Sequence, residues 1–194
     1  MSNPLRVFGM AGSLRKGSFN CSLLRAAQQL APEGMRIDSF EALADIPPFN
    51  QDLEKTPPPA VVELKRQIRE ADAVLLVTPE YNYSVPGVLK NAIDWASRPY
   101  GDSAWTGKPA AIMGASGGIL GSARAQYHLR QMFVFLNMYT VNQPEVMVAQ
   151  ANQRFDEKGN LTDETAKKLI RQLLEELGRL ARLHLSAKLE RKTA

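Results

Sequence analysis

The sequence predicts one α/β domain spanning residues 1–194, with a three-layer, doubly wound parallel sheet of five strands in the order 2-1-3-4-5. Apolar runs alternate with segments of helical periodicity, which is the pattern of strands joined by crossover helices. The third and fourth runs are continuously apolar, as expected of strands buried on both faces. A length of 194 residues with 44% hydrophobic residues suffices for one sizeable core, and no internal repeat or linker divides it.

The five strands are expected over 5–10, 35–40, 73–78, 109–116 and 139–148. Arg36 and Asp38 alternate with apolar residues in the second strand, which indicates an edge strand with one solvent-facing side. Pro144 interrupts the fifth strand and confines it to an edge or a bulge. Both features place these two strands at the borders of the sheet.

Helices are expected between the strands and at the end of the chain. The last helix carries an apolar stripe that includes His184, which we expect to be a packed, hydrogen-bonded histidine rather than a catalyst. In the helix before the fourth strand, Trp95 lies off the apolar stripe and is a candidate for a subunit contact. The fourth helix, near 122–137, is apolar almost all round, so we expect a partner subunit to cover its second face; a thicker local core is the alternative.

Composition excludes several classes of function. The net charge is +4 and the pI is near 9.3, but no aromatic-interleaved basic patch or recognition motif accompanies the basic end, so we expect no nucleic-acid partner. No apolar run approaches a membrane span and the start does not resemble a signal peptide, so we expect a cytoplasmic protein without a membrane partner. The single cysteine, Cys21, and two distant histidines predict no metal site.

Three unusual loops, at 12–20, 79–84 and 116–121, follow the first, third and fourth strands. These strands are neighbours in the predicted order, and ligands of such sheets bind at the carboxyl ends of the strands near the switch in strand order. We therefore expect the three loops to meet on one edge of the sheet and to form a ligand site there.

The first loop, "GSLRKGSFN", has the composition of a phosphate cradle. Ser13, Ser18 and Asn20 supply short hydrogen-bonding groups, Arg15 supplies a charged fork, and the following helix begins with free amides. Lys16 precedes Gly17, so the loop is not a Walker A motif, and it also lacks the G-x-G-x-x-G spacing. A polar turn without a ligand is the alternative.

The other two loops suit a flat ring. "PEYNYS" combines two tyrosines with amide and hydroxyl groups, and "ASGGILG" allows a close approach to its backbone at Gly117 and Gly118. Together the three loops predict a planar heterocycle joined to a phosphate.

"GSLRKGSFN" followed by "PEYNYSVPGVLKNAIDWASRP" resembles the NAD(P)H-dependent FMN reductase family of flavodoxin-like proteins, and in particular its bacterial quinone and chromate reductase branch. The resemblance covers nearly the whole chain. It implies bound FMN, with the phosphate at the first loop and the isoalloxazine at the second and third. The implied cofactor-binding residues are Ser13, Arg15, Gly17, Ser18, Phe19, Asn20, Pro79, Glu80, Tyr81, Asn82, Ser84, Ser116 and Gly117.

The resemblance also implies an activity. NADPH or NADH would reduce the flavin and leave, and a quinone, chromate or similar small acceptor would then take the electrons in a ping-pong cycle. The chemistry resides on FMN, so we expect no catalytic side chain. The family forms homodimers and, in this branch, homotetramers. An electron carrier of the flavodoxin type, which the pI near 9.3 disfavours, and a flavin-free scaffold are the alternatives.

Overall fold

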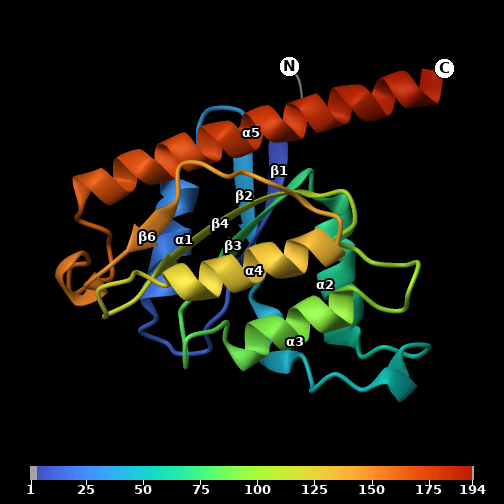
Figure 1. Ribbon diagram of the computed structural model, residues 1–194, viewed down its shortest axis with the longest axis horizontal. Coiled ribbons are helices and arrows are strands. Elements are labelled where there is room, and N and C mark those ends of the chain that lie inside the picture. Colours follow the sequence, from blue (N-terminus) through green and yellow to red (C-terminus); the bar gives the residue numbers. More distant parts are fainter. Residues whose placement is uncertain (1–3, 194) are drawn as a thin grey trace.

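The computed structural model describes residues 4–193, so residues 1–3 and 194 of the predicted domain lie outside the described residues (Figure 1). The sheet has the order β2-β1-β3-β4-β5, and β6 also pairs with β4; every pair is parallel. The predicted strand order is therefore confirmed. The strands are β1 (Leu5–Ala11), β2 (Met35–Ser39), β3 (Ala73–Val77), β4 (Pro109–Ala115), β5 (Tyr139–Thr140) and β6 (Val146–Val148).

The predicted fifth strand is divided in two, at the place where the sequence has Pro144. Tyr139 in β5 lies opposite Pro109, and Val146 in β6 lies opposite Met113, so both pieces pair with the same neighbouring strand. Proline cannot donate to a strand ladder, which explains why the pairing stops and restarts around it.

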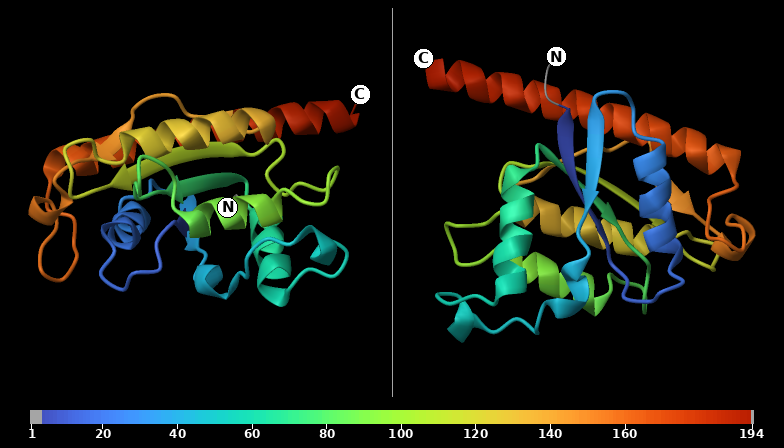
Figure 2. Two further views of the ribbon diagram at one scale, coloured as in Figure 1. Left: turned by 60° about the horizontal axis from the view of Figure 1, so that its bottom comes forward. Right: turned by 180° about the vertical axis from the view of Figure 1, so that it is seen from behind.

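Helices cover both faces of the sheet, as Figures 1 and 2 show. One face is covered by α1 and α5, and the opposite face by α2, α3 and α4. The helix bounds are α1 (Phe19–Gln29), α2 (Pro59–Glu70), α3 (Gly87–Ala96), α4 (Ala123–Phe135) and α5 (Glu164–Thr193), with short 3-10 turns η1 (Ala42–Asp45), η2 (Gln51–Leu53) and η3 (Ala151–Gln153).

Two apolar clusters, one on each face of the sheet, form the core. Every residue of β3 and β4 is buried, as their continuous apolar runs predict. His184 of α5 packs against Tyr139, with ring centroids 4.9 Å apart, so the expectation of a packed histidine is confirmed.

The prediction that Trp95 contacts a partner subunit is wrong. Its side chain is only 1% exposed, its indole N–H donates to the carbonyl of Pro47 at 2.8 Å, and Phe49 packs edge-on against its ring. The segment that contains η1 and η2 folds back over α3 and covers the side of the helix that the periodicity left open. Trp95 is therefore a core residue within one chain, not a subunit contact.

The outer side of α4 carries exposed apolar residues. Leu129 and Phe133 are buried against the sheet, whereas Tyr127, Val134 and Phe135 are 51%, 82% and 72% exposed. A thicker local core therefore does not account for the second apolar face of this helix.

Across residues 4–193, no helix is both long and apolar enough to cross a membrane. Nor do the described histidine, cysteine and acidic residues form a group of three that could hold a metal ion.

Candidate flavin site

The three loops predicted to converge do meet on one edge of the sheet, at the lower left of Figure 1. They enclose a cavity of about 200 Å³, named here the three-loop cavity. Of the predicted site residues, all but Gly17, Asn82 and Ser84 line it. Its lining is Ser13, Arg15, Ser18, Phe19, Asn20, Pro79, Glu80, Tyr81, Ala115, Ser116 and Gly117.

The first loop carries the chain from β1 into α1 and leaves the first amides of α1 without a helical acceptor. Ser18 is the N-cap of α1, and its Oγ accepts from the amides of Asn20 and Cys21 at 3.2 and 3.5 Å. The amide of Phe19, in the first turn, has no intrahelical acceptor. An amide at a helix N-terminus favours an anion both by hydrogen bonding and through the helix dipole.

Arg15 adds a positive charge at the same place. Its amide donates to Ser13 Oγ at 3.4 Å, and its guanidinium carbon lies 5.7 Å from the centre of the Phe19 ring. Among residues 4–193, Arg15 has no carboxylate within ion-pair distance. A guanidinium without a protein counterion beside a helix N-terminus fits a phosphate group.

Asn20 reaches the cavity, but its side chain also joins two loops. Its Nδ2 donates to the carbonyl of Ala115 and its Oδ1 accepts from the Ala115 amide, both at 2.9 Å. The residue is 2% exposed. Asn20 therefore fixes the start of α1 to the end of β4 and sets the width of the cavity, a positioning role that composition and spacing do not reveal.

The second loop is a tight turn. The amides and carbonyls of Tyr81 and Ser84 bond each other in both directions at 3.0 Å, while Asn82 and Tyr83 have φ of 50° and 67°. Two successive residues with positive φ are characteristic of a type I′ turn. Tyrosine adopts this conformation rarely, and such strain is concentrated at ligand sites.

The start of α4 holds this turn in place. Glu80, buried to 7% side-chain exposure, accepts from the Arg124 amide at 2.9 Å and from Arg124 Nε at 2.5 Å. The Glu80 carboxylate raises the pKa of Arg124 by this hydrogen bond. The guanidinium carbon of Arg124 lies 3.4 Å from the centre of the Tyr83 ring, and His128 Nδ1 lies 2.8 Å from Ser84 Oγ.

We call these contacts from Arg124 and His128 the α4 clamp. Sequence reasoning missed it. The spacing of the two residues was the available signal. Positions 124 and 128 share one face of a helix, and this helix begins directly after the glycine-rich loop of the site.

The third loop contributes an open backbone. The Ser116 amide donates to the carbonyl of Val148 at 3.0 Å, which fixes the loop to β6. A Cβ at Gly117 would meet no protein atom within 4 Å. The space beside this backbone is therefore available to a ligand, as the sequence predicts.

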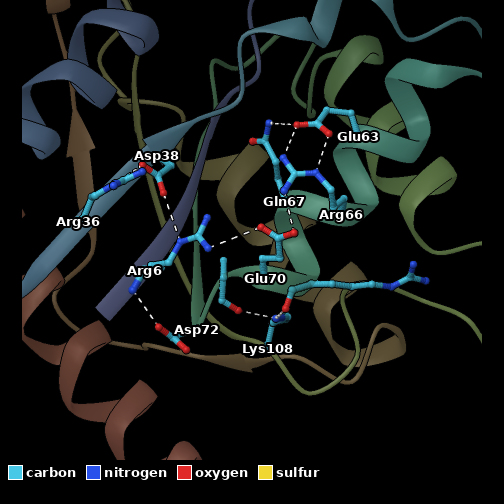
Figure 3. Close-up of polar contacts among 11 residues, drawn as sticks. Arg6, Arg36, Asp38, Glu63, Arg66, Gln67, Glu70, Asp72 and Lys108 are labelled. Carbon is cyan, nitrogen blue, oxygen red and sulfur yellow. Dashed lines mark hydrogen bonds and ion pairs between the residues drawn. The ribbon is translucent and has the colours of Figure 1, made fainter. Parts of the chain in front are cut away.

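A different hollow, over β1, β2 and α2, does not have these properties. Its volume is about 250 Å³ and three arginines line it, but Figure 3 shows each of them paired with a carboxylate. The residues involved are Arg6, Arg36, Asp38, Glu63, Arg66 and Glu70. This hollow has no unpaired arginine for a ligand.

The donors present fit FMN. Phe19, Arg15 and Ser18, which all come from the first loop and the start of α1, line the three-loop cavity and supply an amide, a guanidinium and a hydroxyl for a phosphate. Pro79, Tyr81 and the open backbone at Gly117, from the second and third loops, line the same cavity and can enclose a planar ring.

Comparison with known proteins agrees with this reading. The family model for NADPH-dependent FMN reductase matches residues 5–153. An NAD(P)H-dependent FMN reductase of Pseudomonas aeruginosa is 52% identical over 178 residues, which is 91% of this chain and 95% of the relative. A quinone reductase of Escherichia coli is 47% identical over 167 residues, covering 84% of this chain and 88% of the relative.

Solved structures give the same result. The flavoenzyme NAD(P)H:(acceptor) oxidoreductase FerB of Paracoccus denitrificans superposes with a TM-score of 0.84 at 38% identity, over 92% of this chain and 98% of that one. A flavodoxin, WrbA-like protein of Agrobacterium tumefaciens, at 14% identity and a TM-score of 0.62, shares the fold alone and covers 92% of this chain and 98% of its own. With its flavodoxin-like sheet and three converging loops, the chain belongs to the NADPH-dependent FMN reductase family and is an oxidoreductase that uses FMN and NAD(P)H.

Proposed function

We propose that the three-loop cavity binds FMN and that the chain transfers electrons from NAD(P)H through it to quinones. The observation that carries the proposal is the meeting of an unpaired arginine, a capped helix N-terminus and an open glycine backbone in one cavity. The proposed FMN-binding residues are those implied by the resemblance, with the phosphate at 13–20 and the isoalloxazine at 79–84 and 116–117.

The chemistry that bound FMN supplies is hydride acceptance followed by release of two electrons to an acceptor, in a ping-pong cycle. The chain's own residues bind and orient. Arg15, Ser18 and the first amides of α1 hold the phosphate. The turn at Tyr81, fixed by the α4 clamp, and the backbone of Ser116 and Gly117 hold the ring. Reduction of a quinone to a hydroquinone by one hydride also consumes one proton, which solvent can supply, so no side chain of this site is assigned as its donor.

Quinones are the proposed class of acceptor, and chromate is a second one. Several relatives at 43–47% identity are named as quinone reductases, among them a 2-hydroxy-1,4-benzoquinone reductase of a Burkholderia species. Chromate rests on the sequence resemblance alone. Steady-state rates at several fixed quinone concentrations test the cycle: a ping-pong mechanism gives parallel double-reciprocal lines, and intersecting lines contradict it.

The test of the proposed function is a visible absorption spectrum of the purified protein, before and after anaerobic NADPH. A flavin spectrum that bleaches rapidly and returns when 1,4-benzoquinone is added is the expected result. A flavin that NADPH does not bleach indicates an electron carrier. A colourless protein that does not take up added FMN indicates a scaffold.

We also propose that the chain is a homodimer or homotetramer. The exposed Tyr127, Val134 and Phe135 on α4 support this, because large apolar side chains rarely gather on the surface of a soluble monomeric protein. Light scattering at micromolar concentration should give at least twice the monomer mass of 21.5 kDa. Val134→Ser with Phe135→Ser should shift the mass toward the monomer, and a monomeric unmodified protein contradicts the proposal.

The proposed location is the cytoplasm, where the NAD(P)H that the enzyme needs is held. Cell fractionation followed by immunoblotting tests it, and recovery of the protein in the membrane or extracellular fraction contradicts it.

A further inference from the structure

A second cavity, of about 380 Å³, adjoins the three-loop cavity at the first loop. Ser13 and Arg15 line both cavities, so the two cavities meet at these residues of the first loop. The second cavity opens over the carboxyl ends of β1 and β2, which run side by side with Gly9 opposite Ser39. We name it the β2-side cavity. It lies on the edge where open α/β sheets bind ligands, but outside the proposed flavin site.

The lining of the β2-side cavity has an apolar part and a polar part. Leu24, Phe40 and Leu43, each about 5% exposed, form the apolar part. The polar residues are Ser13, Arg15, Lys16, Arg25, Gln28, Ser39 and Glu41. Apolar surface for a base, with charged groups beside it for a phosphorylated sugar, is the combination that a nucleotide needs.

Two of the cations have no protein counterion. Within residues 4–193, neither Lys16 nor Arg25 has a carboxylate at ion-pair distance; Arg25 donates to Ser22 Oγ at 2.8 Å. The arginines of the hollow over β1, β2 and α2 are all paired (Figure 3). Lys16 therefore leaves a positive charge beside the cavity that an external anion can neutralise. Arg25 also lines the cavity, but its Nη2 lies at Ser22 Oγ and beside Gly159, so its guanidinium has to turn from there to reach the same anion.

Glu41 supplies a carboxylate just after β2. Its Oε1 accepts from Ser39 Oγ at 2.6 Å, so the side chain is fixed at the rim. In dinucleotide-binding sheets, an acidic residue near the end of the second strand bonds the ribose 2′-hydroxyl, and a nearby arginine accommodates a 2′-phosphate. The β2-side cavity contains both kinds of group, the Glu41 carboxylate and the cations Lys16 and Arg25.

We infer that the β2-side cavity binds the adenosine end of the dinucleotide, with Lys16 and Arg25 at the 2′-phosphate of NADPH. The dinucleotide then crosses the first loop, so that its nicotinamide reaches the flavin proposed to occupy the three-loop cavity. This inference rests on the proposed function. The positive charges of Lys16 and Arg25 favour the 2′-phosphate of NADPH, whereas the Glu41 carboxylate favours the free 2′-hydroxyl of NADH. Because the two cations outnumber the carboxylate, we expect a net preference for NADPH.

The kinetic test measures kcat/KM for NADPH and for NADH with 1,4-benzoquinone. In Lys16→Gln and in Arg25→Gln, kcat/KM for NADPH should fall roughly tenfold, the usual effect of losing one charged hydrogen bond, with little change for NADH. Glu41→Gln should change the ratio in the opposite direction, toward NADPH. A general loss of structure would not shift the cofactor preference toward NADH in Lys16→Gln and toward NADPH in Glu41→Gln. Arg171→Gln, which removes the same charge from an exposed position on α5, should leave the ratio unchanged.

Two outcomes overturn the inference. One is an equal effect of Lys16→Gln on NADPH and NADH. The other is loss of FMN from that variant, which would assign Lys16 to the flavin site instead.

A binding measurement separates this inference from the proposed function. Calorimetry of the purified protein should show adenosine 2′,5′-bisphosphate binding roughly tenfold more tightly than ADP, which has no 2′-phosphate, and Lys16→Gln should remove the difference. Equal binding of the two nucleotides contradicts the inference even when quinone reduction is fast. Selective binding without any quinone reduction contradicts the proposed function alone.

Discussion

The guanidinium carbon of Arg124 lies 3.4 Å from the centre of the Tyr83 ring, and the same side chain bonds the carboxylate of Glu80. Glu80 and Tyr83 belong to the turn that faces the cavity, and Arg124 belongs to the first helical turn of α4. The helix therefore holds the turn at two points. Tyr83 requires such support because its φ of 67° is unfavourable for a residue with a side chain.

Removing the clamp should release the flavin. In Arg124→Gln we expect the FMN dissociation constant to rise about tenfold, because both a charge-assisted hydrogen bond and a cation–π contact are lost. Arg124→Lys keeps the charge but loses the planar fork, so its effect should be smaller. Flavin fluorescence on titration measures both constants.

Arg179→Gln is the matched control for the clamp. It also breaks an arginine–glutamate pair, the one with Glu176, but on the exposed surface of α5. FMN binding should be unaffected there. Equal loss of affinity in Arg124→Gln and Arg179→Gln would show that the clamp does not act on the site.

Arg15 should govern retention of the cofactor. Arg15→Lys keeps one positive charge but replaces the fork by a point charge, so we expect the variant to purify with less FMN and to bind it several-fold more weakly. The ratio of absorbance at 450 nm to that at 280 nm gives the occupancy. Full occupancy in Arg15→Lys would mean that the phosphate does not lie at the first loop.

Much of the fold follows from local pattern. Alternating strands and helices, continuous apolar runs in the central strands and Pro144 near the sheet edge each report a local property, and the sheet order follows from them. Trp95 could not be placed in this way, because the segment that buries it, with Phe49, comes from far along the chain. Periodicity describes one helix and does not show what folds over it.

The candidate site, like the fold, could be predicted from the sequence only in part. Convergence of the three loops follows from the strand order, but the contacts between the loops do not. Asn20 with Ala115 and Glu80 with Arg124 are separated by 95 and 44 positions, and nothing in the local sequence links the partners. Such pairs depend on how close two loops come in space, and this requires coordinates.

Asn20→Asp tests the link between α1 and β4. An aspartate can accept from the Ala115 amide but cannot donate to the Ala115 carbonyl, and it buries a charge facing a carbonyl oxygen. We expect the free energy of unfolding to fall by about 3 kcal/mol. Urea unfolding of the FMN-free protein should show the loss, because the bond joins two parts of the chain. A loss seen only with FMN present would instead indicate a direct contact with the phosphate.

Gly117→Ala tests the third loop. A methyl group at Gly117 meets no protein atom within 4 Å, so the thermal midpoint of the FMN-free protein should stay within about 2 °C of the unmodified value. The methyl group would enter the space that we assign to the ring, so FMN affinity should fall by about tenfold. Gly118→Ala is the control, since its nearest contact is Ser116 Oγ at 3.8 Å and the residue does not line the cavity. Unchanged FMN affinity in Gly117→Ala would place the ring elsewhere.

Asp102 gives the protein a predictable response to acid. The pKa of its carboxyl group is lowered, first by the hydrogen bond from Lys65 at 2.8 Å and then by one from Arg69. A lowered pKa in the folded state contributes stability above the unfolded-state pKa, near 4, and this contribution is lost as the pH falls through the folded-state value.

Lys65 is nearly buried, with a side chain 9% exposed, whereas that of Asp102 is 57% exposed, so the pair contributes only about 1 kcal/mol. Asp102→Asn should therefore be less stable than the unmodified protein in urea at pH 7, and the difference should shrink as the pH falls below about 4, the pKa of an unperturbed aspartate. Asp52→Asn, an exposed position in η2, should show no such difference; a gap for Asp102→Asn that stays constant with pH would contradict the assignment.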